Sequence, residues 1–414
     1  MARKMKDSGI EWIGEIPEGW EIGQIGQLYS ERRTKVSDKD YPPLSVTMKG
    51  ILPQLSTAAK TDAHDDRKLV CKGDFAINSR SDRRGSCGIS EQDGSISLIN
   101  TVLQPRGEMN PGYYNWLFHT SMFADEFYKW GHGIVDDLWT TGWSDMKKIG
   151  VPVPSKCEQK QLAEHLNFEC SNIDTILSKT RSSIEEYKKL KQAVITQAVT
   201  KAIHDDFGNP SKFRKLRSLC DVLSKGTTPK DIETQNDEFY CIRYLKSENI
   251  VSNQLNLNPT FFITAETNNS LERSKLNSGD ILFVIAGASI GKVAITTADF
   301  LPANTNQAVA FIRLSSSYQY ATKYIWYFLQ SDVVKQLIAL SAVQSAQPNL
   351  SLEDLGAMRL PLPDQMGCLK ITDYLDAKCA EIDRLIAKKE QLVKELESYK
   401  KSLIYEVVTG KREV

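Results

Sequence analysis

The glycine-containing stretch G-A-S-I-G-K-V at residues 287–293 is the first place to look for catalytic chemistry, because loops of this composition can cradle phosphates. Only three residues separate Gly287 from Gly291, whereas a phosphate-binding loop needs four to bend its amides around the ligand. Val293 also stands where such a loop carries the Ser or Thr that binds Mg²⁺. The stretch therefore does not predict nucleotide hydrolysis.

Two other patterns could support catalysis, but each lacks the partners that it needs. Asn110-Pro111-Gly112-Tyr113 is similar to the N-P-P-Y motif of amino-methyltransferases, but Gly112 replaces the second proline and no glycine-rich cofactor loop accompanies it. A turn in front of an aromatic helix is the favoured interpretation. The histidines lie apart, without the spacing of a metal site or a Ser-His-Asp triad: His64, His119, His132, His165 and His204. We expect no catalytic site, no metal site and no cofactor bound by this chain.

A polar, arginine-rich loop after an apolar run is the best candidate for binding chemistry. Arginine can take the edge of guanine or clamp phosphates, while Ser and Asn suit contacts to bases or to the DNA backbone. In the first half the candidates are Asn78, Ser79, Arg80, Arg83 and Arg84. In the second half they are Ser289, Lys292, Asn304, Asn306 and Gln307. The side-chain amides of the Asn and Gln residues suit adenine. A solvated surface loop is the alternative at each position, and recurrence in both halves favours binding.

Bulk composition is compatible with DNA binding but does not indicate it. The 414 residues allow two or more domains, and 52 basic against 52 acidic residues leave no global positive field. The polar N-terminus is not a secretory signal, and no stretch approaches the roughly 18 apolar residues of a membrane span. Eight scattered cysteines without a C-x-x-C pair favour reduced thiols. We expect a cytoplasmic protein.

An internal repeat organises the chain. Adding 209 to a residue number between about 144 and 201 gives a related residue without a gap. The V-P-V-P of residues 151–154 matches the L-P-L-P of 360–363, and Ile173-Asp174 matches Ile382-Asp383. The chain is therefore two tandem halves, each a globular segment followed by a copy of this tail.

Each copy of the tail has the apolar period of a helix that pairs with another helix. Seam positions alternate four and three residues apart, and no Gly or Pro interrupts residues 158–207 or 368–409. The first seam includes Leu166, Ile173, Leu177, Ile184, Tyr187 and Val194. The second includes Leu375, Ile382, Ile386, Val393, Leu396 and Leu403. The alternative is a pair of amphipathic helices, each packed only on its own domain.

A second apolar row on these helices predicts a further partner. It consists of Ile176, Leu190, Ile195 and Val199 in the first copy and Leu385, Tyr399, Ile404 and Val408 in the second. A helix with two apolar faces usually has two partners. We infer two antiparallel helices that hold the globular domains apart and offer a surface to another subunit. Because the second helix must return along the first, we expect the C-terminus near the first domain.

The globular segments, about 20–143 and 213–350, predict an α+β fold. Each has an apolar run around a Gly-Asp turn, L-V-C-K-G-D-F-A-I at 69–77 and L-N-S-G-D-I-L-F-V-I at 276–285. Each then shows an aromatic helix, Y-Y-N-W-L-F at 113–118 and Y-I-W-Y-F-L at 324–329. We interpret these aromatic runs as core rather than as platforms for nucleobases. Short strands mixed with helices are typical of α+β domains.

Two globular domains alternating with two related long helices resemble the architecture of the specificity subunits of type I restriction-modification systems. The opening K-D-S-G-I-E-W-I-G-E-I-P-E-G-W of residues 6–20 is similar to the start of such proteins. The boundary V-P-V-P-S-K-C-E-Q-K-Q-L-A at 151–163 resembles their P-x-x-E-Q-x-x-I pattern. Residues 403–411, L-I-Y-E-V-V-T-G-K, resemble their ending. Departures are Gly367-Cys368 in place of a second E-Q pair and Lys201 in place of a glycine.

This resemblance implies a division of labour. Residues 1–150 and 208–355 would be target-recognition domains that each read half of a bipartite site in double-stranded DNA. Residues 151–207 and 356–414 would be helical spacers that bind two methyltransferase subunits. Those partners would bring S-adenosylmethionine chemistry, and restriction subunits would add ATP- and Mg²⁺-dependent translocation and cleavage. The alternatives are a coiled-coil adaptor that binds only proteins and a stand-alone DNA-modifying enzyme, which the absence of catalytic motifs disfavours.

Overall fold

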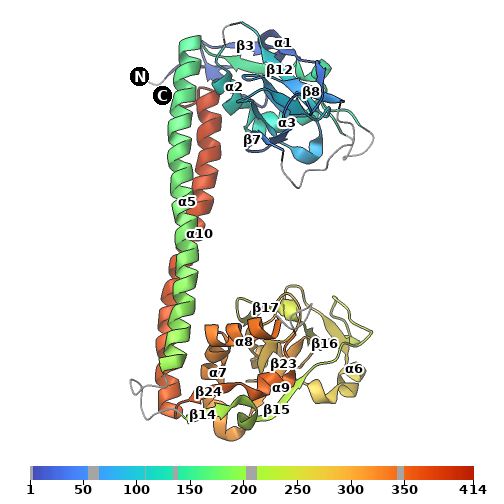
Figure 1. Cartoon of the computed structure of the whole chain (residues 1–414), viewed down its shortest axis with the longest axis vertical. Helices are drawn as coiled ribbons and strands as arrows, with labels where there is room; N and C mark the ends of the chain where they lie inside the picture. The colour runs from blue at the N-terminus through green and yellow to red at the C-terminus, as the bar shows by residue number, and fades with distance from the viewer. Residues whose placement is uncertain (1–2, 55–64, 108, 134–138, 202–211, 343–348) are drawn as a thin grey trace. The chain divides into compact units, whose positions relative to one another are not determined.

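The structure is a computed structural model that describes residues 3–54, 65–107, 109–133, 139–201, 212–342 and 349–414. It divides into two compact units (Figure 1). The first unit contains residues 1–181 and 391–414, and the second contains residues 182–390. Each unit therefore combines one globular domain with a part of both long helices. The domain boundaries near 150, 207 and 355 stay predictions from sequence.

A four-stranded antiparallel sheet forms the centre of the first globular domain. Its strand order is β10-β9-β12-β4, with β4 at Tyr29–Glu31, β9 at Phe75–Asn78, β10 at Cys87–Ile89 and β12 at Asn100–Pro105. Every residue of β9 is buried, which is why the Gly-Asp turn leads into a continuous apolar run rather than an alternating one.

Shorter strands and helices surround this sheet. The hairpins and pairs are β1 (Met5–Asp7) with β2 (Glu15–Pro17), β3 (Glu21–Gln24) with β13 (Gly150–Val153), and β6 (Leu44–Thr47) with β7 (Gly50–Pro53). A three-stranded sheet has the order β11 (Gly94–Ile96), β8 (Arg67–Val70), β5 (Lys35–Val36). The helices are α1 (Ile25–Leu28), α2 (Pro111–Phe118), α3 (Ser121–Lys129) and α4 (Trp143–Met146).

The second globular domain repeats this plan. Its four-stranded sheet has the order β21-β20-β23-β15, with β15 at Cys220–Lys225, β20 at Ile281–Val284, β21 at Val293–Ile295 and β23 at Val309–Leu314. A pair of β14 (Lys212–Lys215) with β24 (Arg359–Leu362) corresponds to β3 with β13. A hairpin of β17 (Ile250–Val251) and β18 (Gln254–Leu255) corresponds to β6 with β7. The two domains therefore share the topology of the four-stranded sheet and of these two strand pairs.

The described part of the second domain also contains a mixed sheet, α-helices and short 3-10 helices. The sheet has the order β19 (Phe262–Thr264), β16 (Tyr240–Leu245), β22 (Ala303–Thr305), and β16 runs parallel to β22. The α-helices are α6 (Ala265–Ser270), α7 (Thr322–Leu329), α8 (Asp332–Ala342) and α9 (Leu352–Ala357). Helices combined with mostly antiparallel sheets confirm the α+β fold.

The aromatic helices α2 and α7 are core elements, as the sequence predicted. Tyr113, Tyr114 and Phe118 of α2 are almost completely buried, and so are Tyr324 and Phe328 of α7. Burial of rings this large accounts for much of the apolar area that each domain removes from water. The turn in front of α2 is also confirmed, because the Asn110 side chain caps the helix by accepting from the Tyr113 amide at 3.2 Å.

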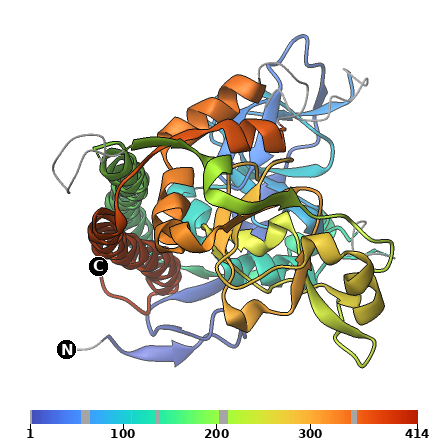
Figure 2. The same ribbon diagram turned by 90° about the horizontal axis from the view of Figure 1, so that it is seen from below.

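Two long helices, α5 (Lys156–Lys201) and α10 (Gln365–Val408), contribute to both units. They lie side by side, and their ion pairs set an antiparallel register (Figures 1 and 2). In the first unit Lys400 Nζ lies 2.6 Å from Asp174. In the second unit Lys191 Nζ lies 2.6 Å from Asp383. The repeat relates these two pairs, since Asp174 matches Asp383 and Lys191 matches Lys400.

The predicted seam is buried between the helices or against the domains. Leu166, Ile173, Leu177, Ile184, Leu375, Ile382 and Leu403 are buried. Tyr187, Val194, Ile386, Val393 and Leu396 are partly buried. The pairing of α5 with α10 is therefore confirmed, and the alternative of two helices packed only on their own domains is wrong.

Each globular domain also holds the end of the helix that belongs to the other repeat. In the first unit the Tyr113 hydroxyl donates to the Val408 carbonyl of α10 at 2.7 Å. In the second unit the Tyr324 hydroxyl donates to the Val199 carbonyl of α5 at 3.3 Å. The expected position of the C-terminus beside the first domain is confirmed by the first of these contacts.

The E-Q pair at the first helix boundary has a structural explanation. Glu158 accepts hydrogen bonds from Ser155 at the helix start and from Trp20 Nε1 at 3.2 Å, and it pairs with Arg3. The amide of Gln159 bridges Pro154 and Asn110. At the second boundary, where Gly367 and Cys368 replace this pair, Asp364 accepts from the Gly367 amide at 2.8 Å instead. Both helix starts are capped, by different side chains.

Candidate nucleic-acid interface

The arginine-rich loop joins β9 to β10 at residues 79–86, on the edge of the four-stranded sheet. Its first positions face inwards. The Asn78 side chain accepts from the Arg80 amide at 3.0 Å, and Ser79 Oγ lies 3.0 Å from Thr101 Oγ1; both residues are buried. The interpretation of Asn78 and Ser79 as DNA-contacting residues is therefore corrected: they shape the loop, because inner sheet positions need internal partners for their polar groups.

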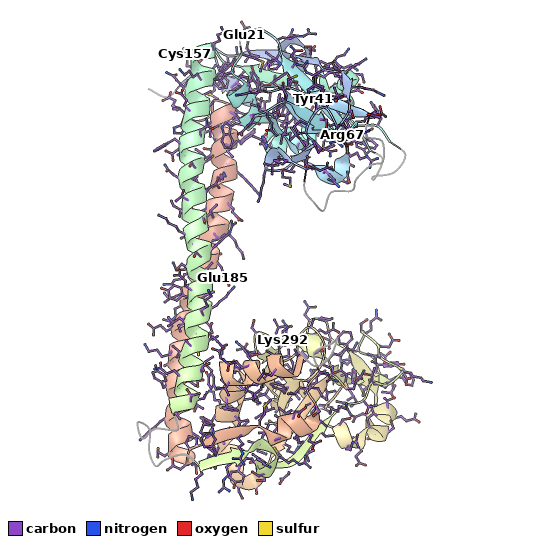
Figure 3. All side chains as sticks on the ribbon, in the orientation of Figure 1. Glu21, Tyr41, Arg67, Cys157, Glu185 and Lys292 are labelled. Carbon is purple, nitrogen blue, oxygen red and sulfur yellow. The ribbon has the colours of Figure 1, made fainter. Side chains whose placement is uncertain are left out.

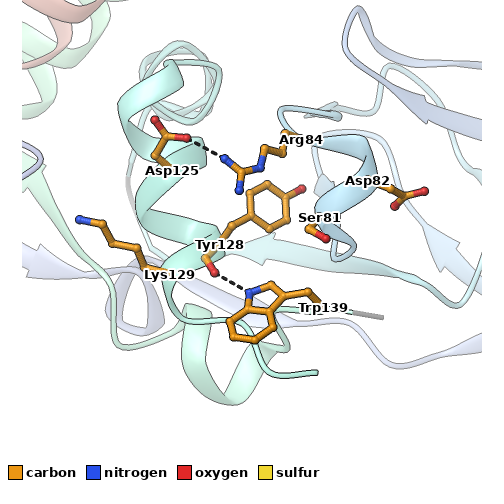
Figure 4. Close-up of a pocket in the computed structure, with 7 residues that line it drawn as sticks. All are labelled: Ser81, Asp82, Arg84, Asp125, Tyr128, Lys129 and Trp139. Atoms are coloured by element: carbon orange, nitrogen blue, oxygen red, sulfur yellow. Dashed lines mark hydrogen bonds and ion pairs between the residues drawn. The ribbon is translucent and has the colours of Figure 1, made fainter. Parts of the chain in front are cut away.

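The arginines of this loop face outwards to different degrees. Arg80 is half-buried, and its backbone forms a bridge with Thr140. Arg83 is exposed and lies 4.0 Å from Asp82. Arg84 is also exposed, and its guanidinium is held at 3.0 Å from Asp125 and above the Tyr128 ring, 5.2 Å from the centroid (Figure 4). A guanidinium restrained in this way loses less freedom on binding than one on a free side chain.

An open hollow adjoins Arg84, and sequence reasoning missed most of its lining. Its volume is about 640 Å³, and besides Arg84 it includes Asp125, Tyr128, Lys129 and Trp139 (Figure 4). Trp139 Nε1 donates to the Tyr128 carbonyl at 2.8 Å, which fixes the indole beside α3. These residues come from α3 and the segment before α4, and no local spacing pattern links them to the loop.

The matching loop of the second unit joins β20 to β21 at residues 285–292 and has the same length. Its backbone also matches, since the Val284 amide donates to Lys292 as the Asn78 amide donates to Ser86, at 2.9 and 2.8 Å. Ser289 is partly buried and corresponds to Arg83, while Lys292 is exposed (Figure 3). The loop leads into a strand rather than a helix, so it lacks the helix N-terminus of a phosphate-binding loop.

The three amide candidates of the second unit lie in different environments. Asn304 is completely buried in β22 and donates to Asn268 at 3.1 Å, so its interpretation as an adenine-reading residue is corrected: its amide is used inside the domain. Asn306 is partly buried and accepts from the Ala308 amide at 3.2 Å. Gln307 is exposed and accepts from the Thr228 hydroxyl. DNA contacts of Asn306 and Gln307 stay predictions, as they do for the arginines, Ser289 and Lys292.

No metal-binding geometry occurs in the described parts of the chain, where no three His, Cys, Asp or Glu side chains come together. The His119 ring is partly buried, and desolvation lowers its pKa despite its contact with the Asn115 carbonyl. All eight cysteines are free, and burial raises the pKa of the Cys87 thiol. His64 and His204 lie outside the described residues. Among the described helices, none is both long and apolar enough to cross a membrane.

The sequence of this chain is similar to those of known specificity subunits. Residues 209–395 match the family model of the type I restriction modification DNA specificity domain. The specificity subunit of the type I restriction enzyme EcoBI from Escherichia coli is 26% identical over 258 residues, 57% of this chain and 53% of that subunit. The EcoKI specificity subunit from Escherichia coli strain K12 is 22% identical over 307 residues, 68% of this chain and 64% of that subunit. The chain therefore spans less than two thirds of these relatives.

Solved structures extend the likeness over nearly the whole chain. A chain from a type I R-M system, solved to explain complex assembly and conformational transition, superposes with a TM-score of 0.74 at 13% identity, covering 95% of this chain and 98% of that one. The HsdS subunit from Thermoanaerobacter tengcongensis gives a TM-score of 0.55 at 15% identity, covering 96% of this chain and 98% of that one. At such identities the likeness shows the fold alone. The chain is therefore similar to type I restriction-modification specificity subunits in its fold, and residues 209–395 match their DNA specificity domain.

Proposed function

We propose that this chain is the sequence-reading subunit of a type I restriction-modification complex and that each globular domain reads one half of a bipartite DNA target. The observation that carries the proposal is the duplication of one four-stranded sheet topology with different side chains on the matching loops. Arg80, Arg83 and Arg84 in the first domain correspond to Ala286, Ser289 and Ile290 in the second. Two domains that share this sheet topology but carry different loop side chains suit two different short base sequences.

The exposed part of the second apolar row supports the binding of two methyltransferase subunits. In the first unit Ile176 and Tyr399 are 47% and 45% exposed, and in the second unit Leu190 and Leu385 are 48% and 36% exposed. The repeat of 209 residues relates the two pairs. By contrast, Ile195, Val199 and Val408 are buried, and Ile404 is partly buried against the first domain. Two like apolar pairs fit two copies of one partner.

Catalysis would lie in those partners. A methyltransferase subunit would bind S-adenosylmethionine, and restriction subunits would bind ATP and Mg²⁺. This chain's own residues would position the DNA: exposed Arg and Lys side chains would neutralise phosphates, and loop side chains would select bases.

The decisive experiment is to express the chain with its methyltransferase subunit and to map the methylated sites in the DNA of the host cell. We expect methylation at a single split sequence with a fixed spacer, and protection of both half-sites by the purified complex. The chain without the methyltransferase should neither bind S-adenosylmethionine nor cut DNA. A complex that assembles but protects no defined sequence would favour the protein-only adaptor.

The exposed apolar pairs have a separate test. Replacing Ile176 and Tyr399 together by Ser should weaken the binding of one methyltransferase copy, and replacing Leu190 and Leu385 should weaken the other. Native mass spectrometry would count the copies that remain. Unchanged stoichiometry and affinity in both double variants would exclude these pairs as the docking surface.

A further inference from the structure

Each unit has a groove beside the loop at residues 79–86 or the matching loop at residues 285–292. In the second unit it has a volume of about 400 Å³ and lies between the loop (Ile290–Lys292), the turn residue Asn253, the α7 end at Gln330, helix α8 and the α5 residue Gln192. In the first unit a groove of about 330 Å³ is bounded by the matching elements: the loop at Arg84–Gly85, the hairpin tip at Met48, the α2 end at His119, helix α3 and the α10 residue Lys401. The repeat relates Gln192 to Lys401, so each long helix forms one wall of one groove.

The second-unit groove is basic. Lys292 and Lys335 line it, and no carboxylate does. The Lys292 side chain is exposed and makes no hydrogen bond or ion pair with the described residues. Lys335 donates to the side-chain oxygen of Gln192 and lies 3.6 Å from Asp332, yet its side chain is 56% exposed. Both ammonium groups are therefore accessible to an anion.

A polar network fixes the inner wall between these lysines. Gln192 Nε2 donates to the Gln330 carbonyl at 2.7 Å, and Asn253 Nδ2 donates to the Gln330 side chain at 2.8 Å. Asn253 adopts a left-handed conformation with φ of 60°, and its own oxygen accepts from the Val293 amide at 3.3 Å. Ser252 and Asn253 are the two residues between β17 and β18, and positive φ at both is the usual geometry of such a hairpin turn, so the hairpin holds Asn253 at this wall.

The geometry points to a DNA phosphate, held by Lys292 and Lys335, as the occupant of this groove. This inference rests on the proposed function and deepens it, because it assigns a contact with the DNA backbone to a loop residue, Lys292, and an α8 residue, Lys335, in a groove that α5 lines with Gln192. A phosphate matches two exposed lysines and a wall without carboxylates. The first-unit groove also offers two cations, at other positions: Arg84 on the loop, which pairs with Asp125 in the same groove, and Lys401 on α10.

The differences between the two grooves favour DNA over a protein partner. At matched places the first groove has Arg84, His119 and Lys401 where the second has Ile290, Gln330 and Gln192. Two copies of one protein subunit would require like chemistry on both surfaces. DNA requires only that each groove offer cations to its uniform phosphates, while the neighbouring bases differ between half-sites.

The test is the salt dependence of DNA binding by the assembled complex with its methyltransferase subunit. Lys292→Ala and Lys335→Ala should each weaken binding to cognate and unrelated duplexes by the same factor. Each should also lower the slope of log K against log salt by about one, and the double variant by about two. Between about 50 and 200 mM salt, the affinity gap between the wild type and a single variant should shrink by about 3.5-fold.

Matched variants separate a specific contact from a general loss of charge. Lys378→Ala removes one exposed lysine of α10 in the same unit, outside the groove, and should leave the slope unchanged. Lys335→Arg keeps the charge and should restore the wild-type slope. Suppose that the wild-type complex binds its target specifically. The phosphate site is then excluded if both alanine variants keep the wild-type slope of log K against log salt. It is also excluded if the variants lose affinity for the cognate sequence alone. If the wild-type complex binds no DNA, the proposed function fails and this inference fails with it.

Discussion

The two units solve one folding problem with different residues. In both, the aspartate of the Gly-Asp turn is buried beside the four-stranded sheet and paired with an arginine. In the first unit Asp74 pairs with Arg32, which follows β4, whereas in the second Asp280 pairs with Arg313 on β23. The carboxylate keeps its place while the cation comes from a neighbouring strand. The four-stranded sheet therefore depends on its strand order and on neutralisation of the buried aspartate. The position that supplies the arginine can differ between the two domains.

The largest expected effect is a change of half of the DNA target. Exchanging residues 20–143 for the domain of another family member should replace one half-site and leave the other half-site and the spacer unchanged. Each base pair that a domain rejects costs about 1–3 kcal/mol, so several rejected pairs together outweigh the loss of any single side chain. Mapping of methylated sites would measure this. A change in both half-sites would show that the domains do not read independently.

The buried ion pairs should have the next largest effect, on stability. Arg32→Met or Arg313→Met leaves an aspartate buried without a cation, which costs about 3–5 kcal/mol. Hydrogen exchange should show that each change loosens only its own unit. Arg33→Met is the matched control, because Arg33 is 78% exposed and should cost under about 1 kcal/mol. Adding Asp74→Asn to Arg32→Met should recover much of the loss; a double variant no better than the single one would contradict this explanation.

The loop arginines should have a moderate effect, confined to one half-site. Replacing Arg80, Arg83 or Arg84 by Ala should reduce methylation of the target, and a member that contacts a base should lose about 1–3 kcal/mol of discrimination. Arg106→Ala, an exposed arginine of the same domain outside the loop, is the control. Unaltered methylation and unaltered sequence preference in all three variants would show that the loop is only surface.

The two helix starts should differ in their response to acid. Burial raises the pKa of Glu158, but hydrogen bonds from Ser155, Trp20 and Arg3 outweigh it and hold the pKa below its ordinary value. This carboxylate therefore stabilises the first unit above the ordinary glutamate pKa of about 4.3, and the contribution is lost as the pH falls through the lowered pKa.

Glu158→Gln should remove this part of the acid sensitivity of the first unit and cost about 1 kcal/mol at neutral pH, in the range of a lost helix cap. Unfolding followed by hydrogen exchange at pH 7 and at about pH 3, well below the ordinary glutamate pKa of about 4.3, would measure both. The second unit provides the internal reference, since Gly367 and Cys368 stand in place of the E-Q pair. An equal loss of stability in the variant and the wild type on acidification would contradict the role of Glu158.

The smallest expected effect concerns the repeated ion pairs of the helices. Asp174–Lys400 and Asp383–Lys191 are partly exposed, so a double-mutant cycle on either pair should give a coupling of about 0–1 kcal/mol. Because the repeat relates the pairs, the two couplings should agree and should fall with added salt. A coupling well above this range in one unit alone would show that the two halves of the helix pair are not equivalent.

The sequence predicts the fold more completely than the interface. The four-three spacing of apolar residues, the prolines before each helix and the 209-residue offset suffice to predict that the helices pair. The buried aromatic runs are recognisable by their composition. The direction of a loop side chain is not recognisable from the sequence. Asn78, Ser79 and Asn304 have polar neighbours in the sequence, yet each forms hydrogen bonds inside its domain. The grooves escaped prediction because their walls come from five separate elements. The one signal in the sequence was the match of Gln192 with Lys401 at the repeat offset.

The contact between Tyr113 and Val408 has a consequence for how the protein is made. The first unit needs residues 391–414, which a ribosome adds after the whole of the second unit, whereas residues 182–390 of the second unit form one continuous stretch. Domains generally fold as they emerge, the N-terminal one first. In this chain the first domain to emerge is completed after the second unit, because Leu403, Val407 and Val408 must be added before they can cover its aromatic core. A nascent chain that stalls just after residue 390 would therefore carry all residues of the second unit and a first unit whose aromatic core is still uncovered.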